Sequence, residues 1–75
     1  MEDFVKRMLE EFKELDERGM KLGTFLNSEV FKTLPIEEQR DMYSQWHAMV
    51  LYKTALGNRL IRKGFTDIFD KGGAA

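Results

Sequence analysis

The chain has 75 residues, a formal net charge of -1 and no cysteine. A chain of this length folds as one small domain that buries only about 60% of its unfolded surface, so we expect self-association to add stability. The lack of cysteine excludes disulfides and thiolate metal sites. The balanced charge argues against binding to DNA or RNA polymers.

No apolar stretch approaches the roughly 18 residues of a membrane span. The acidic start at Glu2 and Asp3 also lacks the basic and then apolar pattern of a signal peptide. We therefore expect a cytoplasmic protein with no membrane partner. Neither an internal repeat nor a Ser/Pro-rich linker divides the chain, which predicts a single domain over residues 1–75.

The first predicted helix covers residues 3–26. One face of it alternates at spacings of three and four residues, which is typical of a helix packed along a single seam. The members of this seam are Val5, Met8, Phe12, Leu15, Gly19, Leu22 and Leu26. Glycine inside a helix costs roughly 1 kcal/mol relative to alanine. Gly19 therefore either makes room for a large neighbour, which we favour, or is simply tolerated.

Residues 27–34 are predicted to connect the first helix to a second one. This connection begins with the turn-forming pair Asn27 and Ser28, and its length is ordinary for a helix–helix connection. We expect its apolar residues, Val30, Phe31 and Leu34, to fold back over this end of the pair of helices.

The second predicted helix covers residues 35–63. Pro35 suits its first turn, where a missing N–H costs nothing, and Gly64 is expected to leave the helix in a left-handed conformation. The apolar residues form one seam and a second stripe beside it. The seam consists of Met42, Trp46, Met49, Leu56 and Leu60, and the stripe of Tyr43, Val50 and Gly57. One helix cannot cover both, which predicts more than one packing partner.

The short tail, residues 65–75, places Phe65, Ile68 and Phe69 at helical spacing, which suggests one further turn. Together the elements predict an all-α fold, an antiparallel helical hairpin that assembles into a helical oligomer. With the connection placed at residues 27–35, antiparallel pairing sets Gly19 against Tyr43 and Leu15 beside Trp46. The residues assigned to the oligomer interface are Tyr43, Trp46, Val50 and Tyr52.

No pattern in the sequence predicts catalysis. Several acidic residues of the first helix precede bases by four positions, as Glu14 precedes Arg18, which indicates a solvated face. His47 is the only histidine, and no Glu-x-x-His pair or phosphate loop is present. We therefore predict no enzyme, no catalytic residue, no metal site and no cofactor.

Positive residues gather at the open end of the predicted hairpin. No acid occurs between Lys53 and Lys63, and the start of the first helix adds Lys6 and Arg7. Arginines placed in this way can bind phosphate bidentately, although complementing the helix dipole would explain the same residues. The residues assigned to ligand binding are Arg59, Arg62, Asn58, Lys63, Lys53 and Arg7.

The sequence resembles the phage hairpin family of anti-CBASS and anti-Thoeris signal sponges over roughly residues 5–63. The residues that carry the resemblance are Glu14-Leu15-Asp16-Glu17, Lys21-Leu22, Phe25-Leu26-Asn27-Ser28, Phe31-Lys32-Thr33-Leu34-Pro35, Glu38-Gln39, Met49, Tyr52, Leu56 and Arg59-Leu60. The resemblance implies a homo-oligomer, typically a hexamer. It also implies sequestration of cyclic di- or trinucleotides, or of cyclic ADP-ribose isomers, without cleavage in the infected bacterial host. A basic residue late in the second helix binds phosphate in such proteins, and the matching position is Arg59.

A rival interpretation is a small helical adaptor. In that case the exposed apolar stripe takes a helix of a partner protein, and the cations only complement the helix dipole. The two hypotheses differ in what they require of Arg59, which only the sponge needs, while both need Tyr43.

Overall fold

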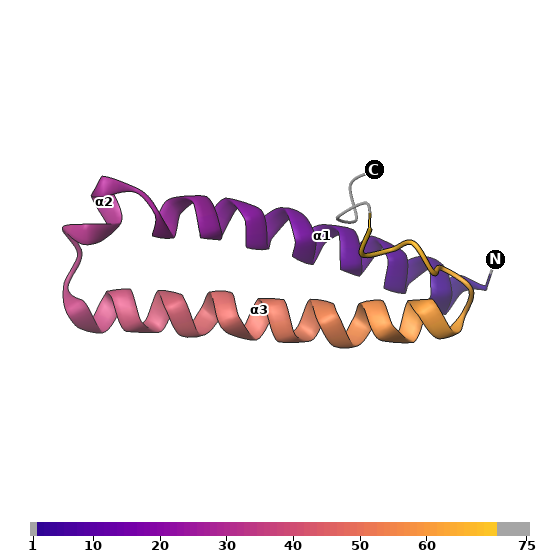
Figure 1. Cartoon of the computed structure of the whole chain (residues 1–75). Helices are drawn as coiled ribbons and strands as arrows, with labels where there is room; N and C mark the ends of the chain where they lie inside the picture. Colours follow the sequence, from indigo (N-terminus) through magenta and orange to yellow (C-terminus); the bar gives the residue numbers. More distant parts are fainter. Residues whose placement is uncertain (1, 71–75) are drawn as a thin grey trace.

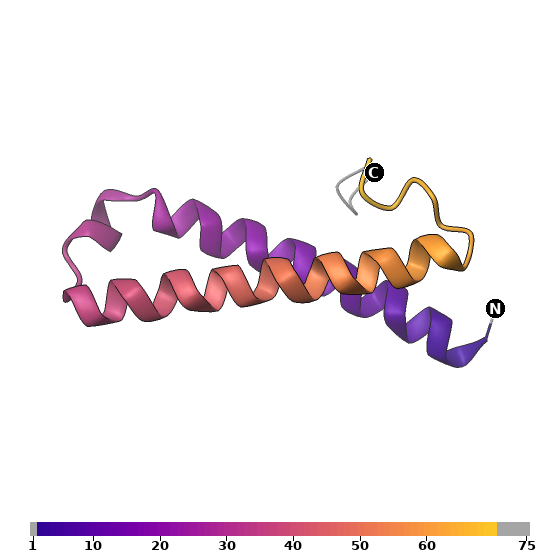
Figure 2. The same ribbon diagram turned by 60° about the horizontal axis from the view of Figure 1, so that its bottom comes forward.

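Two long helices, α1 (Asp3–Leu26) and α3 (Ile36–Arg62), run antiparallel, and the short helix α2 (Glu29–Lys32) joins them at one end (Figure 1). This computed structural model describes residues 2–70, and within that range it contains helices and turns but no strand. Figure 2 shows that the long helices cross at an angle. The predicted helical hairpin is confirmed, and both helices begin and end within about one residue of the expected positions.

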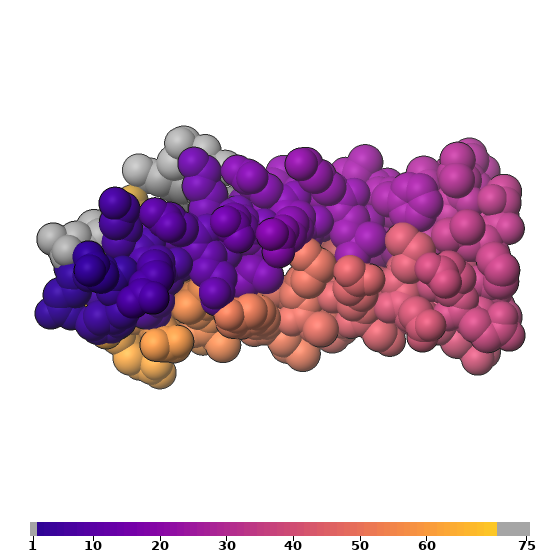
Figure 3. Space-filling view, turned by 180° about the vertical axis from the view of Figure 1, so that it is seen from behind, coloured from indigo at the N-terminus to yellow at the C-terminus, as the bar shows by residue number. Residues whose placement is uncertain are grey.

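The main core lies toward the open end of the hairpin. Its buried side chains come from both long helices, and Phe12 and Leu60 are the largest that are fully buried. The cluster consists of Met8, Phe12, Leu15, Leu56 and Leu60, with Leu9, Phe65 and Ile68 packed against it. Full burial of a side chain of this size contributes roughly 1.5–3 kcal/mol. Figure 3 shows α1 and α3 in contact along one face.

The closed end has a smaller aromatic cluster. The Ser28 hydroxyl caps α2 by accepting a hydrogen bond from the Phe31 N–H at 3.2 Å. Phe31 is buried, and its ring meets Phe25 and Tyr43 edge-on at 6.1 and 5.4 Å between centroids. The predicted fold-back of the connection is confirmed for Phe31. It is wrong for Val30, which is 60% exposed.

Gly64 ends α3 as predicted. Its φ is +105°, in the region that favours glycine. The N–H of Gly64 donates to the Ile61 carbonyl and the N–H of Phe65 to the Leu60 carbonyl, at 3.0 and 3.1 Å. These two bonds form a Schellman motif, which turns the chain back toward the hairpin.

The pairing of the two long helices differs from the one expected. The indole N–H of Trp46 donates to the Gly19 carbonyl at 3.2 Å, so Gly19 meets Trp46, whereas Tyr43 packs on Phe31. The shift arises because the helices cross and α2 lengthens the closed end. The expected space for a large neighbour is found at Gly23, where a Cβ would lie 3.2 Å from the Trp46 indole nitrogen. A Cβ on Gly19 would have nothing within 4 Å.

The chain after Gly64 folds back over the hairpin as hydrogen-bonded turns, where one further helical turn was expected. We call residues 65–70 the strap (yellow in Figure 1); the rest of the predicted tail, 71–75, lies outside the described residues. The Phe69 ring covers Gly57, where any Cβ would collide with it. The same ring meets Phe12 edge-on at 5.7 Å. The strap therefore adds a third side to the core at the open end.

Two matched glycine substitutions test this packing. Gly57→Ala should lower the free energy of unfolding by about 1–3 kcal/mol, because the new methyl group displaces Phe69. Gly19→Ala should raise it by roughly 0.5–1 kcal/mol, because it removes the helix cost of glycine without a clash. Urea unfolding at one fixed protein concentration measures both. Equal effects of the two substitutions would contradict the packing of Phe69 on Gly57.

Candidate functional site

The cations in the last turn of α3 and at its C-cap lie on the surface. Arg59, Arg62 and Lys63 are all exposed, as are Asn58 and Arg7. Lys63 places its ammonium 5.0 Å from the centre of the Phe4 ring on α1, a cation–π distance that joins the two helices at the open end. The hairpin thus brings Lys63 close to the start of α1, as the sequence predicted.

Arg59 shares its side of α3 with Tyr52. The Tyr52 hydroxyl donates a hydrogen bond to the Glu11 carboxylate across the helix pair. This hydrogen bond is the main cause that raises the pKa of Tyr52 above its ordinary value of 10.0; partial burial and the Glu11 charge act in the same direction, and the Arg59 charge opposes them.

Lys53 is engaged differently from the other predicted ligand residues. Its ammonium lies 3.0 Å from an Asp16 carboxylate oxygen, and the side chains of Lys53 and Asp16 are 27% and 5% exposed. Arg59 follows Lys53 by six residues, about 120° around the helix axis. Lys53 and Arg59 therefore face different sides of α3, and the structure separates Lys53 from the other cations.

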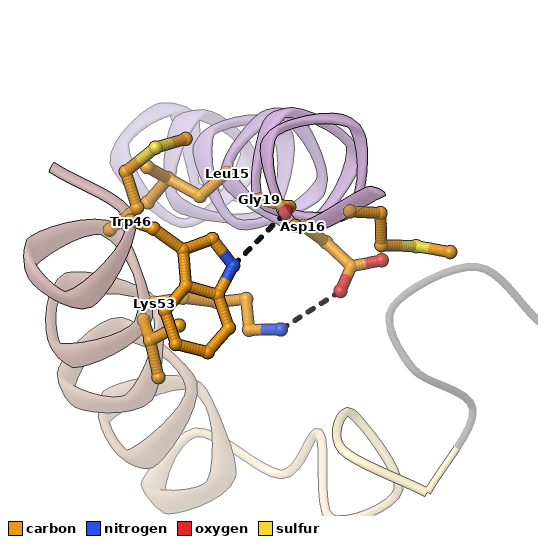
Figure 4. Close-up of a pocket in the computed structure, with 9 residues that line it drawn as sticks. Leu15, Asp16, Gly19, Trp46 and Lys53 are labelled. Atoms are coloured by element: carbon orange, nitrogen blue, oxygen red, sulfur yellow. Dashed lines mark hydrogen bonds and ion pairs between the residues drawn. The ribbon is translucent and has the colours of Figure 1, made fainter. Parts of the chain in front are cut away.

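An open groove runs between α1 and α3 beside the Asp16–Lys53 pair. It encloses about 220 Å³. Trp46 and Lys53 reach into it from α3, and Gly19 and Asp16 line it from α1 (Figure 4). The complete lining is Leu15, Asp16, Gly19, Met20, Gly23, Trp46, Met49, Val50 and Lys53. Apart from one ion pair this interhelical groove is apolar.

The residues predicted for the oligomer interface divide into two pairs. Tyr43 and Tyr52 are 52% and 50% exposed. Trp46 and Val50 are half-buried, because they line the interhelical groove. Further large apolar side chains are exposed on both long helices, including Met20 at 63% and Leu51 at 62%.

Within residues 2–70, no group of three or more His, Cys, Asp and Glu side chains is placed to hold a metal ion. His47 is exposed, and the centre of its ring lies 6.3 Å from that of Trp46. In the same range, no helix is long and apolar enough to cross a membrane.

Sequence reasoning missed two carboxylates that shape these surfaces. No pattern in the sequence assigned Asp16 or Glu11 to a contact between the helices, yet Asp16 is buried and Glu11 binds across the hairpin. Asp16 carries a signal that could have placed it, because it follows Phe12 by four residues and therefore lies on the same face of α1. Glu11 carries no comparable signal.

These features define a small helical hairpin with an exposed cationic end. A family model, described as Sequestin, matches residues 2–62. The chain therefore belongs to the sequestin family, whose members are phage anti-CBASS and anti-Thoeris proteins that sequester immune signals and are non-catalytic. This confirms the family that the sequence resembles. No curated protein and no solved structure matches the chain.

Loss of one partner of the Asp16–Lys53 pair tests its structural role. Lys53→Met should lower the free energy of unfolding by about 3 kcal/mol, because it leaves a buried carboxylate unpaired. The double variant Asp16→Leu/Lys53→Met should recover most of this loss. Arg18→Met, which breaks the exposed Glu14–Arg18 pair at 3.7 Å, is the control and should cost less than about 0.5 kcal/mol. A loss for Lys53→Met as small as the control's would contradict burial of the pair.

Titration of Tyr52 tests its bond to Glu11. Because the folded-state pKa is raised, the stabilisation from this bond should be present below pH 10.0 and lost as the pH rises through the folded-state pKa. The phenolate absorbance of the folded protein should include a late component that Tyr52→Phe removes. Glu11→Gln should shift this component to lower pH, since an uncharged acceptor holds the phenol proton less strongly. An unchanged titration in Glu11→Gln would show that the bond does not form in solution.

Proposed function

We propose that this sequestin is a homo-oligomeric sponge, a hexamer, in the cytoplasm of the infected bacterium. It binds cyclic di- or trinucleotides, or cyclic ADP-ribose isomers, without cleaving them. The observation that carries this proposal is the acid-free, exposed cationic end of α3. Family membership supports cyclic nucleotide signals as the ligand class.

The cations at this end are available to an anion. The ion pairs of the described residues involve Arg18, Lys32 and Lys53, and leave Arg59 and Arg62 without a carboxylate partner. A guanidinium can bind two oxygens of one phosphate, with geometry that lysine does not offer. We therefore assign Arg59 and Arg62 as the principal phosphate ligands, with Asn58, Lys63 and Arg7 beside them.

Lys53 belongs to the proposed ligand set only in an indirect role. Its charge is balanced by Asp16 at 3.0 Å, and moving it to a phosphate would leave a buried carboxylate unpaired, which is costly. Its contribution to the site is to hold α1 against α3 while the arginines contact the ligand.

Oligomerisation is supported by the surface that one chain exposes. The exposed area is 5559 Å², about 800 Å² more than the roughly 4,800 Å² typical of a compact monomer of 8.8 kDa. A standard interface buries about 800 Å² per partner. We propose that Tyr43, Trp46, Val50 and Tyr52 lie at these interfaces. Assembly would place several copies of Arg59 around one ligand, which a single exposed hairpin cannot do.

Sequestration requires affinity and abundance and no chemical step. A protein that binds the messenger tightly lowers its free concentration by mass action, so that its receptor stays empty. The candidate site offers cations and no paired acid and base, which suits retention of the ligand more than hydrolysis.

Calorimetric titration with a panel of cyclic di- and trinucleotides and cyclic ADP-ribose isomers tests this function. At least one should bind and be recovered intact. Arg59→Ala should weaken binding roughly ten- to hundredfold, because one charge-assisted contact contributes about 1.5–3 kcal/mol. Arg40→Ala, at the other end of α3, is the control and should bind as the wild type does.

The adaptor remains the second candidate, because Tyr43 and Leu51 are exposed. It expects Arg59→Ala to retain function and Tyr43→Asp to lose it, whereas the sponge expects both to fail. No heat with any member of the panel, from folded protein, would reject the sponge. Recovery of a cleaved ligand would replace it with an enzyme.

A further inference from the structure

The interhelical groove has unfilled space above Gly19. Gly19 lines it, and a Cβ built on Gly19 would meet no heavy atom within 4 Å. Trp46 forms one wall, fixed in place by its hydrogen bond to the Gly19 carbonyl. The groove can therefore take an apolar side chain over Gly19 without rearrangement of the hairpin.

At the open end, the groove side of the hairpin already accommodates an apolar side chain, which the strap supplies. Gly57 follows Lys53 by four residues on α3, and Phe12 precedes Asp16 by four on α1, so both lie on the groove side of their helices. There the Phe69 ring fills the space over Gly57 and packs edge-on against Phe12. The strap covers the open end and leaves the space over Gly19 unfilled.

The charges in the groove disfavour a phosphate ligand. Its one cation, Lys53, is paired with Asp16, and the remaining lining is apolar or glycine. The carboxylate would repel a phosphate, and Arg59 faces about 120° away around α3. The groove is thus distinct from the proposed ligand site, and its occupant is an apolar, uncharged side chain.

We propose that a second copy of this chain occupies the groove, with an apolar side chain packed over Gly19 and against Trp46. This inference rests on the proposed oligomer and identifies one of its contacts. The chain itself offers suitable exposed side chains, among them Met20, Leu51 and Tyr43. The excess exposed area, about 800 Å², matches what one partner contributes to a standard interface. The flexible side chains of Met20 and Met49 line the groove and can adapt to the inserted group.

Substitution at Gly19 tests the occupant without disturbing the hairpin. Gly19→Gln fills the groove with a polar side chain, whereas Gly19→Ala has the same absence of clash but leaves most of the space open. Both variants should fold, because nothing lies within 4 Å of the new Cβ and both residues favour helix over glycine. Circular dichroism verifies the fold, and light scattering coupled to size exclusion measures the mass.

The wild type and Gly19→Ala should have the same oligomeric mass, well above the 8.8 kDa of one chain. Gly19→Gln should assemble at least tenfold more weakly and reach a smaller mass. Trp46 is the only tryptophan, so its fluorescence reports on the groove directly. Its emission should shift to shorter wavelength as the wild type is concentrated, and Gly19→Gln should not show this shift.

Two outcomes would overturn the inference, and they differ in whether they also contradict the proposed oligomer. A helical Gly19→Gln variant with the wild-type mass would show that the groove lies outside the interface, while the proposed oligomer would stand. A wild type that remains a single chain at all concentrations would remove both the occupant and the oligomer. The ligand titration of the wild type decides nucleotide binding independently of either result.

Discussion

Two packed helices can bury only one stripe of each, and this constraint determines where the molecule is complete and where it is open. The open end receives a third side from the strap, whose Phe69 covers Gly57. The closed end receives one from α2, whose Phe31 is buried between Phe25 and Tyr43. The middle of the hairpin has no such cover, and the groove over Gly19 lies there.

The cations of α3 form two groups, and only Lys53 is paired with Asp16. Lys53 is held in a partly buried ion pair and contributes to the hairpin itself. Arg59 and Arg62 lie in water without carboxylate partners among the described residues. Because the pair neutralises the groove, the proposed apolar association and the proposed anion binding can use different sides of α3 without competing for the same surface.

Local rules sufficed to predict the two long helices. The spacing of apolar residues defined both long helices, and Gly64 marked the end of α3, because each depends on residues close in sequence. The pairing of the helices was not predictable in this way. A heptad seam permits registers one turn apart, and the crossing of α1 and α3 with the extra turn of α2 selected the one in which Gly19 meets Trp46.

The candidate site was predictable only in part for the same reason. The acid-free run that contains Arg59 and Arg62 is visible in the sequence, and both arginines are exposed as an anion site requires. The pairing of Lys53 with Asp16 depends on which faces of two helices meet, so composition grouped Lys53 with the arginines although it faces elsewhere. The contact of Phe69 with Gly57 was not predictable either, because it joins the strap to a face of α3 and no local sequence pattern links the two.

The size of the residue at position 57 is limited by a residue that lies beyond the family match. The match ends at residue 62, whereas the ring that covers Gly57 belongs to Phe69. Helix face and cover are thus complementary parts, one inside the matched segment and one beyond it. A side chain at residue 57 of α3 would need the space that the Phe69 ring of the strap occupies, so the strap restricts this position to glycine.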